Sequence, residues 1–128
     1  MLSEETRRLA GGPNHAVLTT LFPNGGPQSN TVWIDHDGEH VLVNSETARQ
    51  KVQNVRLDPR VTVLVLDTED LETWVEVRGR VVEIVEGDEA RSHIDKLSQK
   101  YLGISDYPNP IVSPRVILKI APDSENIH

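Results

Sequence analysis

The sequence predicts a single mainly β domain over residues 1–128, a six-stranded antiparallel sheet closed into a small barrel with two or three short helices. Six strand-like stretches occur, and two helices are inserted among them in the order β-β-β-α-β-β-α-β. Because strands and helices do not alternate, this order disfavours a doubly wound parallel sheet and favours hairpins that form a barrel. A chain of 128 residues, 37% of them hydrophobic, suits one modest core.

The N-terminal part of the chain predicts a short helix followed by three strands. Ser3 is placed to cap a helix over residues 3–10, and Gly11-Gly12-Pro13 ends it. Turn residues at 23–26 and 35–38 separate the stretches that follow. The predicted strands are Ala16 to Leu21, Gln28 to Ile34 and His40 to Asn44.

The C-terminal part predicts three more strands and a longer helix. The run Val61 to Leu66 is apolar on both faces and is predicted to be the most buried strand, whereas Thr73 to Val85 alternates with a period of two. A helix is expected from Gly87-Asp88 to Gly103, where glycine favours termination. We expect an acidic loop over 67–72, irregular structure over 105–114, a last strand over 116–120 and a loose tail over 121–128.

A basic segment between the third and fourth strands, Asn44 to Val61, is the main candidate for a binding site. Ala48, Val52 and Val55 recur at helical spacing, with Ser45 or Thr47 as the expected cap and Asp58-Pro59 as the stop. It also holds four of the chain's 13 basic residues: Arg49, Lys51, Arg56 and Arg60.

A helix start exposes unpaired N–H groups and the positive end of the helix dipole, both of which favour an anion. Together with Thr47, Arg49 and Lys51 it predicts a phosphate site. The competing interpretation is that these cations form the solvated face of an ordinary helix.

The composition argues against several classes of function. The net charge of −7 and the pI near 5.1 disfavour a general nucleic-acid binder. The absence of cysteine, of a signal-like apolar segment at the N-terminus and of a membrane-length apolar run predicts a cytoplasmic protein. The five histidines are scattered, and Asp35-His36-Asp37-Gly38 is ordinary turn composition, so no metal site is predicted. No nucleophile triad or phosphate-loop motif occurs.

Five short motifs together resemble one known family. They are HAVLTT (15–20), PQSNTVWI (27–34), VNSETARQKVQN (43–54), DPRVTVLV (58–65) and WVEVRGRV (74–81). Their order and spacing resemble the split-barrel flavin- and deazaflavin-binding family related to pyridoxamine 5′-phosphate oxidase, over about residues 8–122. The short chain, with TARQK after the third strand and VEVRGRV later, is most similar to the branch that uses the deazaflavin coenzyme F420.

The resemblance implies a split β-barrel homodimer with the cofactor between the subunits. It implies a reductase that transfers hydride from reduced F420 to a conjugated or planar small molecule. Because the cofactor carries that chemistry, no catalytic residue is identified. Alternatives are an FMN-dependent oxidase or reductase, or a non-catalytic protein that binds a flavin, haem or tetrapyrrole. The implied cofactor-binding residues are Gln28, Ser29, Asn30, Thr31 and Val32 along the ring, Ser45, Thr47, Arg49 and Lys51 at the phosphate, and Trp74 from the other subunit.

The charge of the basic segment agrees with F420 rather than FMN. Arg49 and Lys51 are accompanied by neutral Ala48 and Gln50. This is a thin cage for the phosphomonoester of FMN, which has a high charge density and favours closely packed cations and N–H donors. Arg56 and Arg60 lie further along the chain, where they would attract the longer anionic tail of F420.

Overall fold

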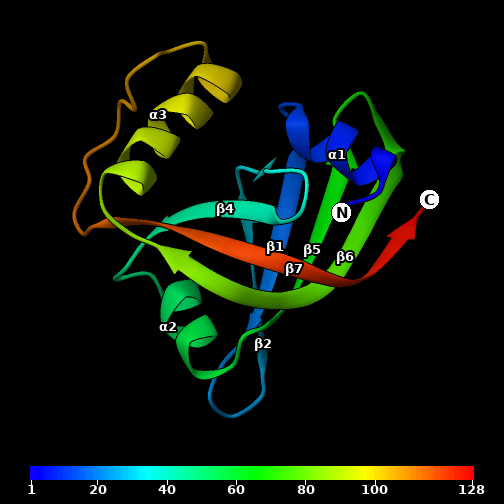
Figure 1. Ribbon diagram of the computed structural model, residues 1–128, viewed down its shortest axis with the longest axis horizontal. Coiled ribbons are helices and arrows are strands. Elements are labelled where there is room, and N and C mark those ends of the chain that lie inside the picture. The colour runs from blue at the N-terminus through cyan, green and yellow to red at the C-terminus, as the bar shows by residue number, and fades with distance from the viewer.

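Seven antiparallel strands form one sheet that curls into a half-barrel, which confirms the mainly β split-barrel fold (Figure 1). The computed structural model describes residues 1–128. The strands lie in the order β2-β1-β5-β6-β7-β4-β3. Their bounds are β1 His15–Leu21, β2 Pro27–Val32, β3 Asp35–His36, β4 Val41–Glu46, β5 Arg60–Asp67, β6 Asp70–Val85 and β7 Arg115–Ile127, and the helices are α1 Glu4–Gly11, α2 Gln50–Leu57 and α3 Asp88–Leu102.

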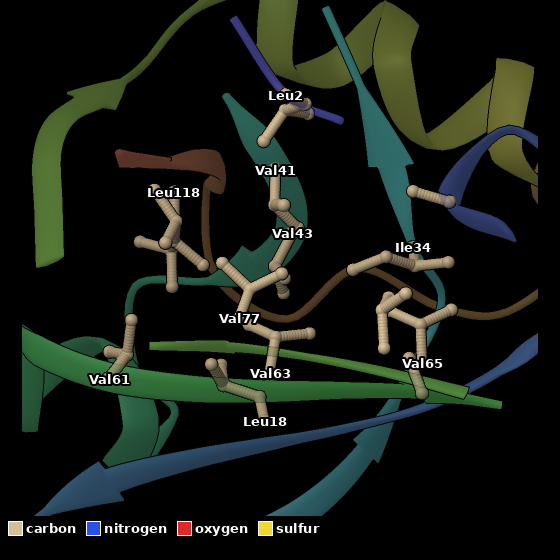
Figure 2. Close-up of a cluster of buried hydrophobic side chains, with 14 of the residues drawn as sticks. Leu2, Leu18, Ile34, Val41, Val43, Val61, Val63, Val65, Val77 and Leu118 are labelled. Carbon is tan, nitrogen blue, oxygen red and sulfur yellow. The ribbon is translucent and has the colours of Figure 1, made fainter. Parts of the chain in front are cut away.

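The curl encloses the main hydrophobic core, because alternate residues of β1, β5 and β6 point to its inner side (Figure 2). Val61, Val63 and Val65 of β5 are buried, and Val75 and Val77 of β6 lie on the same side. Burying a valine or leucine side chain fully contributes about 1.5–3 kcal/mol. The cluster of 18 buried residues therefore supplies the main stabilisation of the barrel.

The three helices pack against strands of the sheet. In α1 the Ser3 hydroxyl accepts a hydrogen bond from the Thr6 amide at 3.1 Å, as the sequence predicts, and Leu9 enters the core. Helix α2 contributes Val52 and Val55 to the same core. Helix α3 packs on β4 and β7 and ends at Gly103, whose φ of 71° lies in the left-handed region. None of the three combines the length and the apolar character needed to cross a bilayer.

The C-terminal strand is the largest departure from the sequence prediction. The tail predicted to be loose continues β7 to Ile127, where it pairs with Val75 of β6. The acidic segment 67–72 is likewise a tight connection, because β6 begins at Asp70. Both segments are polar, but each lies beside a strand whose backbone groups need partners.

Three smaller predictions were also wrong in their bounds. A two-residue strand, β3, lies within the predicted turn at 35–38 and brings the strand count to seven. The second strand ends at Val32. Strand β4 runs on to Glu46 and α2 starts only at Gln50, so neither Ser45 nor Thr47 caps that helix, and the residue before it makes no side-chain capping bond. Backbone pairing of β4 with β7 extends the strand at the expense of the helix.

Glycine at position 79 is required by the close approach of β6 and β7. A Cβ atom at this position would lie 2.0 Å from the carbonyl oxygen of Ala121. The pairing register of the two strands shifts between Arg78 and Gly79, next to Pro122. The irregularity lets β6 bend across the barrel.

Candidate functional site

A pocket of about 570 Å³ opens where β2, β4 and α2 meet α3 and the segment that follows it. It collects residues from both ends of the chain, because the pairing of β4 with β7 places the start of β7 beside the start of α2. The lining residues are Pro13, Asn14, His15, Ala16, Thr31, Val32, Trp33, Asn44, Ser45, Arg49, Lys51, Ile94, Tyr101, Tyr107, Asn109 and Arg115.

Three cations line this one pocket: Arg49, Lys51 and Arg115. Burial lowers the pKa of Lys51, and the charges of Arg49 and Arg115 lower it further. Neither Arg49 nor Lys51 has a carboxylate within ion-pair distance, whereas Arg115 pairs with Glu46 at 3.2 Å. Uncompensated positive charge in a partly enclosed pocket favours a bound anion.

An aromatic wall stands beside the cations. Trp33 and Tyr101 stack with ring centroids 5.1 Å apart and planes inclined by 4°, and the Tyr107 ring meets Trp33 edge-on at 6.0 Å. The Tyr101 hydroxyl donates to the Asn14 carbonyl at 2.8 Å and accepts from the Ile34 amide at 3.0 Å, which fixes the ring. Burial raises the pKa of Tyr101, so its hydroxyl stays protonated at neutral pH. The wall offers a planar apolar surface to a ligand.

Arg115 is held by contacts on several sides. Its Nε donates to Asn44 Oδ1 at 2.8 Å and its Nη1 donates to Glu46 Oε1 at 3.2 Å, while its guanidinium lies 5.4 Å from the centroid of the Tyr107 ring. Glu46 uses its other oxygen to accept from the amides of Val112 and Ser113. Burial raises the pKa of Glu46, but these donors and Arg115 lower it by more, so the carboxyl stays ionised.

A buried contact between a histidine and an aspartate lies behind the pocket. His93 Nε2 is 2.9 Å from Asp35 Oδ2, and His93 Nδ1 is 3.0 Å from Asn44 Nδ2. Burial raises the pKa of Asp35, but the hydrogen bonds from His93 and from the His36 amide outweigh it, and the net pKa is about 2. Two other histidines have partners within the same turn: His40 Nδ1 lies 3.0 Å from Asp37 Oδ2, and His36 Nδ1 accepts from the Gly38 amide.

The pocket brings together half of the residues suggested by sequence. Thr31, Val32, Ser45, Arg49 and Lys51 line it. Gln28, Ser29, Asn30, Thr47 and Trp74 do not.

The residues outside the lining have other neighbours in the single chain. Gln28 accepts from Asn54 at 3.3 Å, and the Ser29 hydroxyl lies 2.8 Å from that of Thr19. The Trp74 ring stacks on His128 with centroids 5.0 Å apart.

Sequence reasoning missed the aromatic wall and the third cation. Trp33 reads as a core or interface residue, and Tyr101 as part of the apolar stripe of its helix. Arg115 stands alone after a proline-rich segment. Only the fold connects these positions to residues 44–51, so no local pattern marks them.

Comparison with known proteins identifies relatives over nearly the whole chain. The family profile described as pyridoxamine 5′-phosphate oxidase matches residues 2–128. A solved structure named F420 reductase is 31% identical, with 98% of each chain covered and a TM-score of 0.83. The conserved hypothetical protein Rv2991 from Mycobacterium tuberculosis is 25% identical, with 99% of this chain and 84% of that chain covered and a TM-score of 0.76.

General Stress Protein 26 from Bacillus anthracis shares the fold at 23% identity, with 97% and 91% of the two chains covered and a TM-score of 0.71. A search of curated protein sequences gave no match.

Proposed function

The chain belongs to the pyridoxamine 5′-phosphate oxidase family, and on that basis we propose that it is a reductase that binds coenzyme F420 in this pocket. Its substrate would be a conjugated or planar small molecule. The observation that carries the proposal is the pair Arg49 and Lys51, which lacks carboxylate partners and lies in the same pocket as an aromatic wall.

The residues present fit a ligand that is planar at one end and anionic at the other. Arg49 and Lys51 would hold the phosphate, and Ser45 of strand β4 lines the same pocket. Thr31 and Val32, at the end of edge strand β2, would contact the ring. When bound in its reduced form, F420 supplies the hydride. The chain binds and orients it and keeps water from the reacting faces.

The F420 assignment rests on charge and on similarity. Arg49 and Lys51 are flanked by neutral Ala48 and Gln50, and the charge of Arg115 is partly offset by Glu46; such a site suits a phosphodiester better than the phosphomonoester of FMN. A relative with 31% identity is named as an F420 reductase, which agrees with this choice.

A homodimer would complete the site. The outer face of the sheet carries Val17, Leu64, Leu66 and Trp74, all only half-buried in the single chain, while α1 and α2 contribute instead to the enclosed core. His15, Leu66 and Trp74 lie in register across β1, β5 and β6, and His15 also lines the pocket. A second copy on this face would therefore cover the pocket, and its Trp74 would flank the ligand.

The test is a titration of the purified protein with F420 and with FMN, each at low and at high salt. We expect tighter binding of F420 and weaker binding at high salt, because exposed contacts to an anionic tail are screened. Oxidation of reduced F420 on addition of a planar acceptor would establish the reductase. Binding without turnover would indicate a carrier or sensor, and tighter FMN binding at both salt levels would move the protein to the flavin-dependent members.

A further inference from the structure

The hydrogen-bond chain behind the pocket has a defined direction. Asn44 Oδ1 accepts from Arg115 Nε at 2.8 Å, so the amide nitrogen of Asn44 faces the other way. That nitrogen donates to the Ala90 carbonyl at 2.9 Å and lies 3.0 Å from His93 Nδ1. His93 Nδ1 must therefore be the acceptor, and His93 Nε2 must carry the proton that faces Asp35. With this one tautomer of His93, every group in the hydrogen-bond series has its donor or acceptor matched.

The surroundings of Asp35 keep it in the acceptor role. Its carboxylate accepts from the His36 amide at 2.8 Å and lies 3.6 Å from Lys96 Nζ, and the charge of Lys100 also favours its ionised form. The series of hydrogen bonds therefore begins at the ionised carboxylate of Asp35 and ends at Arg115.

Arg115 keeps N–H donors that no protein group accepts. Its Nε is bonded to Asn44 and its Nη1 to Glu46, whereas its Nη2 makes no hydrogen bond within the protein. This nitrogen is not fully buried, and Arg115 lines the pocket. Glu46 offsets part of the positive charge, but its second oxygen is occupied by the 112–113 amides.

We propose that Arg115 is an anion-binding residue of the pocket and that Asp35, His93 and Asn44 are positioning residues that aim its guanidinium. Arg49 and Lys51 lie on the neighbouring α2 side, so the ligand anion would meet cations from two directions. The inference rests on the proposed function only in taking the pocket as an anion site, and it does not depend on which cofactor is bound.

Inorganic pyrophosphate is the probe, titrated by calorimetry at low salt. We expect Arg115→Gln to weaken its affinity at least tenfold, as is typical for loss of a charged contact. Arg8→Gln removes the same charge from the exposed face of α1, outside the pocket, and should have little effect. Unmeasurable pyrophosphate binding by the unmodified protein, or equal affinity of the Arg115→Gln variant, would overturn the proposal.

The positioning role is tested by a double-mutant cycle. His93→Leu should weaken pyrophosphate binding several-fold, whereas His93→Asn, which keeps an acceptor near the position of Nδ1, should retain most of the affinity. In the Arg115→Gln background neither change should weaken binding further. Additive losses would show that His93 acts only on the fold and would overturn the role. If His93→Leu does not fold by circular dichroism, Asn44→Leu takes its place in the same cycle.

Parallel titration with F420 separates the two proposals. Pyrophosphate binding that depends on Arg115, with no binding of F420 or FMN, would reject the proposed function and leave this inference standing. Binding of F420, with no effect of Arg115→Gln on the affinity for F420 or for pyrophosphate, would support the proposed function and reject this inference.

Discussion

Arg49 and Lys51 line the same pocket although only Lys51 belongs to helix α2. Residues two apart in an ideal helix point to nearly opposite sides. Arg49 precedes the first helical residue and has an extended backbone, with φ −72° and ψ 144°, which removes this obstacle. Helix α2 begins later than the sequence predicts, and this late start allows both cations to reach one anion.

We expect the double change Arg49→Ala and Lys51→Ala to weaken F420 binding at least tenfold without unfolding the protein. Each charged contact to a phosphate contributes about 1.5–3 kcal/mol, and neither side chain is part of the core. Fluorescence titration at low salt measures the effect. The matched control is Arg8→Ala with Arg80→Ala, which removes two exposed cations outside the pocket. Unchanged affinity in the first variant would place the phosphate elsewhere.

The protein is expected to be a homodimer at micromolar concentration. The half-buried Leu64, Leu66 and Trp74 give the outer sheet face an apolar character that a partner would cover. Sedimentation velocity measures the mass, and Leu64→Glu should shift the population toward monomer while leaving the core intact. A stable monomer across the concentration range would contradict the dimer and, with it, the role given to Trp74.

Acid should remove the stabilising effect of Asp35. The folded state lowers the pKa of this carboxyl from 3.8 to about 2, through hydrogen bonds that outweigh burial, so the contribution is fully present above pH 4. It is lost as the pH falls from about 4 to about 2, and the shift corresponds to about 2 kcal/mol. Urea unfolding of the unmodified protein and of Asp35→Asn at several pH values measures this. The difference in unfolding free energy should shrink toward pH 2, and a constant difference would show that the pairing is energetically neutral.

Ser98→Ala should stabilise the fold by about 1 kcal/mol. The Ser98 hydroxyl is completely buried on α3 and has no hydrogen-bond partner. Removing an unsatisfied polar group and introducing the better helix former both favour the folded state. Thermal unfolding by circular dichroism is the measurement. Ser92→Ala, on the exposed side of the same helix, reports the helix propensity alone and should give a smaller rise in Tm.

Gly79→Ala should destabilise the protein by about 2 kcal/mol or more. The added Cβ would meet the Ala121 carbonyl at 2.0 Å, so β6 and β7 must move apart where their register shifts. Arg78→Ala, at the adjacent exposed position, should change the unfolding free energy far less. Equal effects of the two changes on the unfolding free energy would show that β7 can move away from β6 without a loss of stability.

The sequence predicts correctly those parts of the fold that depend on a local pattern or on a contact between residues close in the chain. Val61, Val63 and Val65 alternate on one strand, and Ser3 meets Thr6 within one helical turn. The polar extension of β7 does not follow, because its pairing with β6 depends on a bend near Gly79 rather than on its own composition.

The same distinction applies to the site. Arg49 and Lys51 are close in sequence and were identified as a pair. Trp33 and Tyr101 stack only because the C-terminal end of α3 lies beside the residues that follow β2. Arg115 reaches Asn44 only through the pairing of β7 with β4. Trp74 stays a prediction, because its role depends on a second copy of the chain.

Glu46 connects the guanidinium of Arg115 with the backbone of the segment that precedes it. One of its oxygens binds Arg115, and the other holds the amides of Val112 and Ser113 at 3.1 and 2.9 Å. Those amides can exchange with deuterated solvent only when the carboxylate releases them. Because a ligand that engages Arg115 rigidifies its partner carboxylate as well, the exchange rates at 112 and 113 would report occupancy of the pocket from outside it.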